Sequence, residues 1–338
     1  MSTWLKNLPK DLQKNLLKKS MPSFEQPMLA TLTTRYFSDK DWIFERKFDG
    51  ARCLIFKDKN TIFLKSRNNK ILNNAYPELV TATKKLKVNQ VILDGEIVAF
   101  HNKITSFEKL QARFGITSTH KALQTNVKIY IYIFDILYLD GYDLTLLPLE
   151  YRKTILKNYI NFNGPIRYTV HKSNFGKQFF KKACQQHWEG LIAKKRDGIY
   201  VHSRSPLWLK FKCIQEQEMV IGGYTLPENS RIGFGSLLLG YYKNNKLMYA
   251  GKVGTGFSDE FLKTFIAKLK KITSNKNYFS SNSMEDDKTI FVKPKYVAQI
   301  GFSNWTKHNI LRQPRFKGLR DDKNAREVIK EIASKKMS

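Results

Sequence analysis

The sequence is poor in cysteine and histidine. Its 338 residues include three cysteines, Cys53, Cys184 and Cys213, without the paired spacings of a zinc site or a disulfide framework. We therefore expect free thiols and a reducing intracellular compartment. The six histidines form no two-histidine motif at metal-ligand spacing. Histidine-based metal catalysis is accordingly not expected.

Long apolar runs are also missing. The most apolar segment, Ile129–Leu139, contains Asp135 and is far shorter than the roughly 20 residues needed to span a bilayer. We expect a buried strand there and no association with a membrane. Leucines at helical spacing from Leu5 to Leu16 lie among lysines, without the continuous apolar core of a signal peptide. Residues 1–25 are therefore expected to form a basic helix and a lead-in, packed on the body or lying near the partner, with packing favoured.

Glycine-rich phosphate-binding motifs are absent too. The Walker A pattern occurs nowhere, and "GKVGTG" at Gly251–Gly256 lacks a βαβ context, so it fits a turn better than a dinucleotide site. If the protein handles a nucleotide, it does so in another way.

Acidic residues are few. The chain has 29 of them against 59 lysines and arginines, which gives a net charge of +30. A polyanionic partner is the natural inference, because such a surface attracts nucleic acid. The alternative is a lysine-rich bias of the source proteome.

The pattern of apolar residues indicates two domains. In the first two thirds of the chain, segments with strand-like alternation of apolar residues are followed by segments with helical spacing. This order predicts a mixed α/β or α+β domain. From about Glu216, short β-like runs with glycine turns predict a small β-barrel with one helix and a last strand near "KYVAQIGF". Residues 273–288 are rich in serine and asparagine and are expected to form an exposed loop. The expected helices are residues 76–86, 106–113, 150–159 and 177–187.

Three of the expected strands carry charged residues at alternate positions, where side chains share one face. These residues are Glu45, Lys47 and Asp49 in the first strand, Asp94 and Glu96 in the second, and Lys210 and Lys212 in the third. Burying one such charge without a partner costs several kcal/mol. Each group alone fits a structural ion pair or a solvated face, but together they indicate a shared site.

Lys47 is the candidate nucleophile. A lysine amine attacks only when it is neutral, and neighbouring cations or burial lower its pKa toward that state. Lys210 and Lys212 are candidates for those cations. Glu96 and Glu189 would suit a hard divalent cation, Mg²⁺ or Mn²⁺, that bridges to phosphate oxygens. The residues therefore suggest attack on phosphorus.

The segment "ERKFDGAR" at residues 45–52 resembles the adenylylation signature of covalent nucleotidyltransferases, the group of ATP-dependent DNA ligases, RNA ligases and messenger-RNA capping enzymes. The remaining signatures follow in order. They are "SRN" at 66–68, "LDGEIV" at 93–98, "IFDILYLDG" at 133–141, "EGLIAKK" at 189–195, "WLKFK" at 208–212 and "RQPRFKGLRDDK" at 312–323.

The resemblance is closest to the ligase module of bacterial ligase D and its stand-alone relatives. It runs through "PMLA" at 27–30, "VIGGYT" at 220–225 and "AGKVGTGFSD" at 250–259. It implies an α+β nucleotidyltransferase (ATP-grasp-like adenylation) domain at residues 26–214. A small all-β OB-fold domain would follow at residues 215–338.

The resemblance also implies roles for individual residues. Lys47 would take AMP from ATP, Glu45 would contact the adenine and Phe134 would stack on it. Arg52 and Arg67 would contact the ribose and phosphates, and Glu96 and Glu189 would bind ribose or metal. Lys210 and Lys212 would hold the α-phosphate. Arg315 or Arg320, with Asp322 and Lys323, would orient pyrophosphate.

The implied activity is that of a DNA ligase using ATP and Mg²⁺ or Mn²⁺ to seal nicks in duplex DNA during repair or end joining. We expect a monomer in the bacterial cytoplasm, associated with the nucleoid, with a Ku-type end-binding protein as a candidate partner. The rivals are an RNA ligase or capping-type nucleotidyltransferase, and an inactive nucleic-acid-binding homologue.

Overall fold

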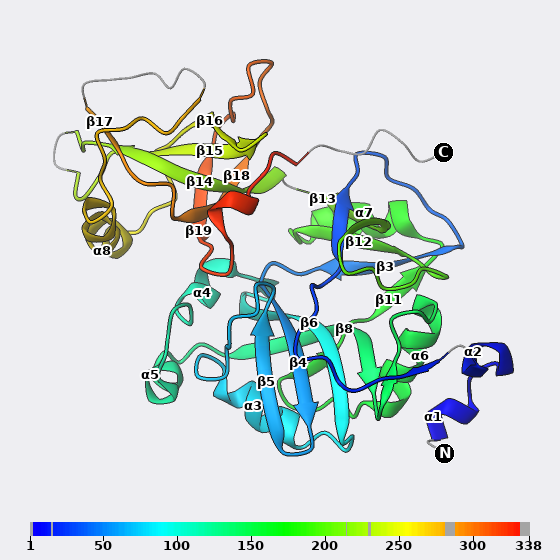
Figure 1. The fold of residues 1–338 in the computed structure, drawn as a ribbon. Coiled ribbons are helices and arrows are strands. Elements are labelled where there is room, and N and C mark those ends of the chain that lie inside the picture. Colours follow the sequence, from blue (N-terminus) through cyan, green and yellow to red (C-terminus); the bar gives the residue numbers. More distant parts are fainter. Residues whose placement is uncertain (1–2, 15, 214, 229–230, 281–287, 332–338) are drawn as a thin grey trace. The chain divides into compact units, whose positions relative to one another are not determined.

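The chain forms two compact units. The computed structural model describes residues 3–14, 16–213, 215–228, 231–280 and 288–331. One unit ends at Cys213 and the other spans residues 214–332, a division one residue before the expected boundary (Figure 1). Each unit has its own hydrophobic core. No helix among the described residues is long and apolar enough to cross a membrane.

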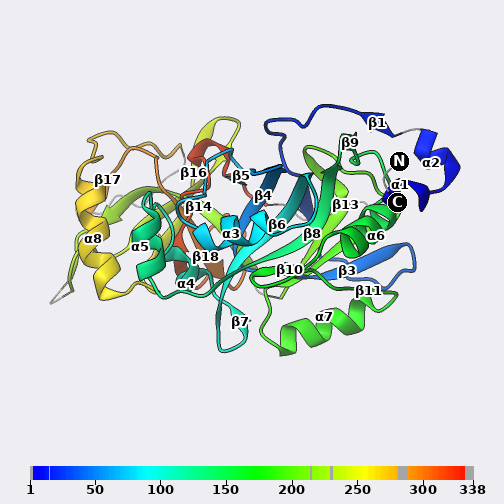
Figure 2. The ribbon, with the colours of Figure 1, turned by 90° about the horizontal axis from the view of Figure 1, so that it is seen from below.

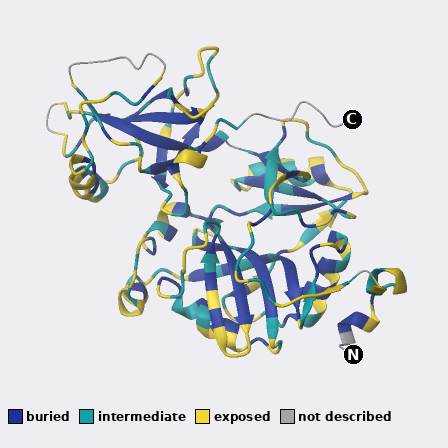
Figure 3. Cartoon of the chain, viewed as in Figure 1, coloured by how far each residue is buried: buried dark blue, intermediate teal, exposed yellow. Residues whose placement is uncertain are grey.

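The first unit contains an eight-stranded sheet, called sheet A below. Its strands run in the order β1-β9-β8-β6-β4-β5, while β10 pairs with β8 and β7 with β6. The bounds are β1 Leu17–Lys18, β4 Ala51–Asp58, β5 Thr61–Ser66, β6 Gln90–His101, β7 Ile104–Thr105, β8 Ile129–Leu139, β9 Tyr142–Asp143 and β10 Ile166–Tyr168. Figure 3 shows that its central strands are buried, which agrees with their nearly continuous apolar sequences.

A second, five-stranded sheet, called sheet B below, completes the first unit. Its order is β11-β3-β12-β13-β2. The bounds are β2 Leu29–Leu32, β3 Trp42–Lys47, β11 His171–Ser173, β12 Gly190–Lys195 and β13 Arg204–Lys212. The register of β13 against β2 shifts between Ser205 and Leu209. Pro206 lies inside this irregularity, where a missing N–H does least harm.

Five helices of the first unit accompany the sheets. They are α3 Pro77–Lys84, α4 Phe107–Gln111, α5 Thr119–Gln124, α6 Leu149–Tyr159 and α7 Gly176–Gln185. Helix α6 packs on β8, and α7 packs on β3, β11 and β12 (Figure 2). All four expected helices are present, with ends no more than two residues from the expected ones. Helix α4 begins where Ser106 accepts a hydrogen bond from the Lys109 N–H, an N-cap.

The expectation of one N-terminal helix is wrong. The segment forms two short helices, α1 Thr3–Lys6 and α2 Lys10–Lys14, separated at Pro9. Proline has no N–H to continue a helix, so the leucine spacing is interrupted there. Trp4, Leu5 and Leu8 are nevertheless buried in the core of sheet A, which confirms packing as the role of these residues.

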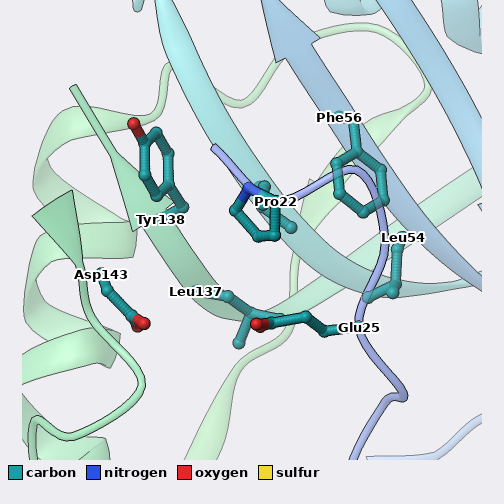
Figure 4. A pocket seen from close by; sticks show the side chains of 8 residues that line it. Pro22, Glu25, Leu54, Phe56, Leu137, Tyr138 and Asp143 are labelled. Carbon is teal, nitrogen blue, oxygen red and sulfur yellow. The ribbon is translucent and has the colours of Figure 1, made fainter. Parts of the chain in front are cut away.

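The lead-in after β1 runs along sheet A. Lys19 forms ion pairs with Glu25 and Asp143 at 3.2 and 3.5 Å. Figure 4 shows the small pocket that remains between Pro22 and Glu25 on this segment and the side chains of Leu54 and Leu137. None of the candidate site residues lines this pocket.

The second unit is built on an antiparallel sheet in the order β16-β15-β14-β18-β19, with β17 paired to β14. Its elements are β14 Gln215–Thr225, β15 Leu237–Lys243, β16 Lys246–Val253, α8 Asp259–Lys270, β17 Thr289–Phe291, β18 Val297–Phe302, β19 Arg315–Leu319 and a 3₁₀ helix at Ala325–Glu327. Strand β19 follows the strand that we expected to be the last. Its sequence "RFKGL" is too short and charged for its pattern to have been recognised.

The loop expected at residues 273–288 is only partly within the described residues, because residues 281–287 lie outside them. Phe279 contradicts the expectation of an exposed loop, since it is buried in the core of the second unit. Its ring fills the space over Gly222 and Gly240.

The expectation of three free thiols is also wrong. Cys184 and Cys213 form a disulfide, while Cys53 is a buried free cysteine. The two bonded cysteines are 29 residues apart, one on α7 and one directly after β13. Their proximity follows from the packing of α7 on β12 and the pairing of β12 with β13. No rule based on the spacing of cysteines predicts this pairing.

Candidate active site

Lys47 is the last residue of β3, and the turn after it is tightly constrained. Asp49 lies in this turn and not on the strand, so the expectation that three charges share one strand face is wrong for Asp49. Its N–H donates to Thr105 Oγ1 at 3.3 Å. Gly50 follows, where a Cβ would come within 2.1 Å of the Ile97 carbonyl oxygen. The chain therefore turns from sheet B into sheet A beside Lys47.

Strand register brings Glu189 to Lys47. Gly190 is the register partner of Lys47 on β3 and of Lys212 on β13, which places the preceding Glu189 at the end of both strands. Gly190 has φ +149°, and a Cβ there would lie 1.8 Å from the Phe211 carbonyl oxygen. Only glycine fits this backbone conformation and this close contact. The side chain of Glu189 forms an ion pair with Lys47 Nζ.

The pKa of Lys47 differs from our expectation. Burial alone would lower it, but the charge and hydrogen bond of Glu189 outweigh burial, and Glu96 and Asp49 add to the effect. The pKa of Lys47 is therefore raised above its ordinary value. Lys47 is therefore held as an ammonium, and it could act as a nucleophile only if the charge of Glu189 were countered.

Glu45 is the centre of a buried network that the sequence reading missed. Its two carboxylate oxygens lie 2.6 Å from Lys153 Nζ and 2.7 Å from Lys194 Nζ. Burial would raise the pKa of Glu45, but the two lysines outweigh it and hold that pKa below its ordinary value. Lys153 also donates to the Thr169 carbonyl at 3.0 Å. This network locks β3, β12 and α6 together.

A signal for Lys194 was present in the sequence, because it is a charged residue in the strand-like segment "EGLIAKK", two positions after the apolar Ile192. Lys153 had none. It lies on α6, 108 residues from Glu45, and looks like any lysine of an amphipathic helix.

An aromatic and cationic cluster lies next to this network. The rings of Phe134 and Trp208 pack edge to face with centroids 5.9 Å apart. Lys194 Nζ lies 4.3 and 4.1 Å from the two centroids, and the Arg52 guanidinium lies 4.8 Å from that of Phe134. Phe134 is only half-buried, so part of its ring stays accessible. Such a surface suits a planar ring with polar edges.

Arg52 is held by a carboxylate from the neighbouring strand. Asp94 on β6 accepts hydrogen bonds from Nε and Nη2 of Arg52, and Tyr200 donates to Asp94 at 2.7 Å. Arg52 also donates to the Met28 carbonyl at 3.1 Å. Asp94 is completely buried, so this bidentate pair fixes the plane of the guanidinium.

The remaining candidates of the first unit lie on the two sheets or between their strands. Glu96 is half-buried on β6, in register with Arg52 on β4. Lys210 and Lys212 are buried on β13, opposite Ile192 and Gly190. Arg67 is half-buried in the turn after β5. The register thus gathers Lys47, Glu189 and Lys212 around Gly190, while Arg52 and Glu96 face each other on sheet A.

The carboxylates can contribute few ligands to a metal ion. Among the described residues no group of three or more His, Cys, Asp or Glu side chains could hold one. Glu189 and Glu96 both lie close enough to Lys47 to raise its pKa. One or two carboxylates, with water and phosphate oxygens as the other ligands, match the preference of Mg²⁺.

The four candidates of the second unit lie on and after β19. Arg320 and Asp322 form a bidentate pair at 2.8 Å, and Lys323 pairs with Glu218 at 2.9 Å. Burial would raise the pKa of Asp322, but Arg320 outweighs it and holds that pKa low. Arg315 is exposed at the start of β19.

Two family models match this chain. The model described as "ATP dependent DNA ligase domain" matches residues 27–212, more than half of the chain. The model described as "ATP dependent DNA ligase C terminal region" matches residues 230–323. The two matches divide between the two units of the structure.

Similar curated proteins carry ligase names. The chain is 34% identical over 313 residues to the "Multifunctional non-homologous end joining DNA repair protein LigD" of Mycobacterium tuberculosis (H37Rv), covering 90% of this chain and 40% of that protein. It is 29% identical to a "DNA ligase" of Thermococcus fumicolans, covering 84% of this chain and 53% of that one. The chain thus spans about 40% of the length of the first of these relatives.

A solved structure described as "mycobacterial DNA ligase D complexed with ATP and MES" is also similar. Its TM-score is 0.64 at 31% identity, over 91% of this chain and 98% of that one. Together with the family models, this likeness gives the fold class: a nucleotidyltransferase-type adenylation domain followed by an OB-fold domain.

Proposed function

We propose that this chain, which belongs to the ATP-dependent DNA ligase family, seals nicks in duplex DNA by carrying AMP on Lys47. The observation that supports this role most strongly is the ion pair of Lys47 with Glu189. Glu96, which also raises the pKa of Lys47, is the register partner of Arg52 in the aromatic and cationic cluster. Through these contacts a half-buried amine is connected to a surface suited to a nucleotide base.

In the first step, Lys47 Nζ attacks the α-phosphorus of ATP, forms a P–N bond and expels pyrophosphate. Before this attack the ammonium must lose a proton to solvent, and the pairing with Glu189 opposes this loss. A bound Mg²⁺ or Mn²⁺ would supply positive charge to the phosphate oxygens. Glu189 and Glu96 would hold it, and Glu189 would then release Lys47.

The other residues of the first unit bind and orient the nucleotide in this proposal. Phe134 stacks on the adenine. Glu45 acts on the adenine through Lys194, since its own carboxylate is occupied by two lysines. Arg52 and Arg67 contact ribose and phosphates. Lys210 and Lys212 lie on β13 beside the register partner of Lys47 and would stabilise charge on the α-phosphate during transfer.

The DNA steps use the same residues. AMP passes from Lys47 to the 5′ phosphate at the nick, and the adjacent 3′ hydroxyl then displaces AMP to form the phosphodiester. The net charge of +30 supplies contacts to backbone phosphates, which require no particular sequence. Arg315, Arg320, Asp322 and Lys323 would orient pyrophosphate in the first step.

The cellular role follows from the similarity to ligase D proteins. We propose double-strand break joining or back-up repair, by a monomer in a nucleoid-associated cytoplasmic location, with a Ku-type end-binding protein as partner. A comparison of nicked DNA with nicked RNA duplexes separates this function from that of an RNA ligase.

The decisive experiment is incubation with α-labelled ATP and Mg²⁺. Wild type should carry label. Lys47→Ala should carry none because it has no amine, and Lys47→Arg should carry none because a guanidinium stays protonated and cannot attack. Lys57→Arg is the matched control, since Lys57 is a buried lysine of β4 outside the proposed site. Label on Lys47→Arg, or no label on folded wild type, would contradict the proposal. Sealing of pre-adenylylated nicked DNA by Lys47→Ala would show that the fold is intact.

A further inference from the structure

The disulfide joins two segments that flank the proposed site. Cys213 directly follows Lys212, and its N–H donates to the Glu189 carbonyl oxygen at 3.0 Å. Cys184 lies on the last turn of α7, four residues before Trp188 and five before Glu189. The bond therefore closes a covalent loop that contains all of β12 and β13. Both ends of this loop adjoin residues to which we assign roles in AMP transfer.

The backbones of β12 and β13 approach each other closely at Gly190, near the disulfide. Gly190 lies against the backbone of Phe211 so closely that a Cβ would meet its carbonyl oxygen at 1.8 Å. Small shifts of the end of β13 are therefore transmitted to Gly190, and through it to Glu189. Opening the disulfide removes the covalent restraint on this contact.

Cys184 is half-buried at the surface of the first unit. Cys184 lines an open surface hollow together with Tyr36, Phe180 and two cationic residues, Lys177 and Lys181. The aromatic rings form its apolar wall, with those of Tyr36 and Phe180 4.2 Å apart. Cys213 does not line the hollow. A reagent entering the hollow would meet the side chain of Cys184 near two positive charges.

From this arrangement we infer that Cys184–Cys213 is a site of reversible exchange with small anionic thiols, and that its redox state controls the alignment of Glu189 and Lys212. The second half rests on the proposed ligase function. Exchange begins when a thiolate attacks Cys184 Sγ, the S–S bond breaks, and Cys213 leaves as a thiolate that takes a proton from water. A second thiolate then attacks the mixed disulfide and frees Cys184. Two thiols are oxidised to one disulfide, and the protein disulfide is reduced to two thiols.

The first test measures exchange alone. Oxidised protein is treated with glutathione, which is anionic, and with cysteamine, which is cationic, and peptide mass spectrometry follows the mixed disulfide on Cys184. At equal thiolate concentration, glutathione should react about two- to five-fold faster, as expected for weak attraction by exposed charges. Lys177→Gln with Lys181→Gln should remove this preference.

The matched control for exchange is Lys182→Gln, because Lys182 is an exposed lysine of the same helix that does not line the hollow. This variant should keep the preference for glutathione. Equal rates for the two thiols in wild type, or no reaction at Cys184, would overturn the exchange site. These results do not depend on ligase activity.

The second test measures the consequence for the site. The rate of labelling by α-labelled ATP is compared between oxidised and reduced protein, and in a Cys184→Ala, Cys213→Ala double variant. We expect the reduced protein and the variant to label roughly ten-fold more slowly than the oxidised protein, since displacements near 1 Å cost up to about a hundred-fold. The variant should not respond to thiols.

Each half of the inference can fail separately. Equal labelling rates in both redox states would overturn the link between the disulfide and the site. Absence of label in every state would refute the ligase function and leave the exchange kinetics as an independent result.

Discussion

Replacing Glu45 by glutamine tests the buried network most directly. The substitution keeps the shape of the side chain but removes its negative charge. Two lysines then face each other without a counter-ion. The side chains of Glu45, Lys153 and Lys194 are only 2%, 3% and 2% exposed, so water can compensate little of the loss.

The expected effect is large. Removing one partner of a buried ion pair costs about 3–5 kcal/mol, because the remaining charge stays buried without compensation. Glu45→Gln leaves two such charges, of which Lys153 keeps its hydrogen bond to the Thr169 carbonyl. We therefore expect the free energy of unfolding of the first unit to fall by about 3–5 kcal/mol at pH 7.

The pH dependence provides an internal check. Burial holds the pKa of Lys194 below its ordinary value even while Glu45 counteracts this effect. Without Glu45, the pKa of Lys194 should fall further. The folded variant then binds fewer protons than its unfolded state, so its stability rises with pH. The difference between wild type and variant should shrink as the pH increases from 7 toward 10.

Urea unfolding followed by tryptophan fluorescence measures the effect, since Trp4, Trp42, Trp188 and Trp208 all lie in the first unit. The matched control is Glu150→Gln. Glu150 pairs with Arg196 at 3.2 Å with both side chains 43% exposed. Its removal should cost less than about 1 kcal/mol. A loss below about 1 kcal/mol for Glu45→Gln, or a difference that does not change with pH, would refute the reasoning.

Three further predictions concern the rest of the chain. Reduction of Cys184–Cys213, which are 29 residues apart, should lower the free energy of unfolding by about 3–4 kcal/mol in urea titrations with and without reductant. Asp322→Asn should destabilise the second unit by about 1.5–3 kcal/mol, read from Trp305 fluorescence, because it weakens a charged pair with Arg320. The low pKa of Asp322 means that this contribution is present at neutral pH and lost as the pH falls below about 4, so the variant and wild type should converge there. Binding of nicked DNA should weaken linearly in a log–log plot against salt, and a flat plot would contradict phosphate-based binding.

The sequence alone determined a large part of this site. Alternation within strands is a local property, so the placement of Glu45 and Lys47 on one strand, and of Lys210 and Lys212 on one face of another, could be predicted without the fold. The ordered signatures likewise predicted the family, because they are read as linear segments, and the family models agree. The net charge of +30 follows directly from the composition.

The tertiary structure decided how the charges are paired. Glu45 meets Lys153 across 108 residues, and Cys184 meets Cys213, because strand register and helix packing bring distant segments together. The pKa of Lys47 depends on the same register, which sets Glu189 beside it and reverses the shift expected from burial and neighbouring lysines. Coulomb energies depend on separations of a few ångströms. Such distances follow from the fold, whereas sequence patterns specify only which residues are available to be paired.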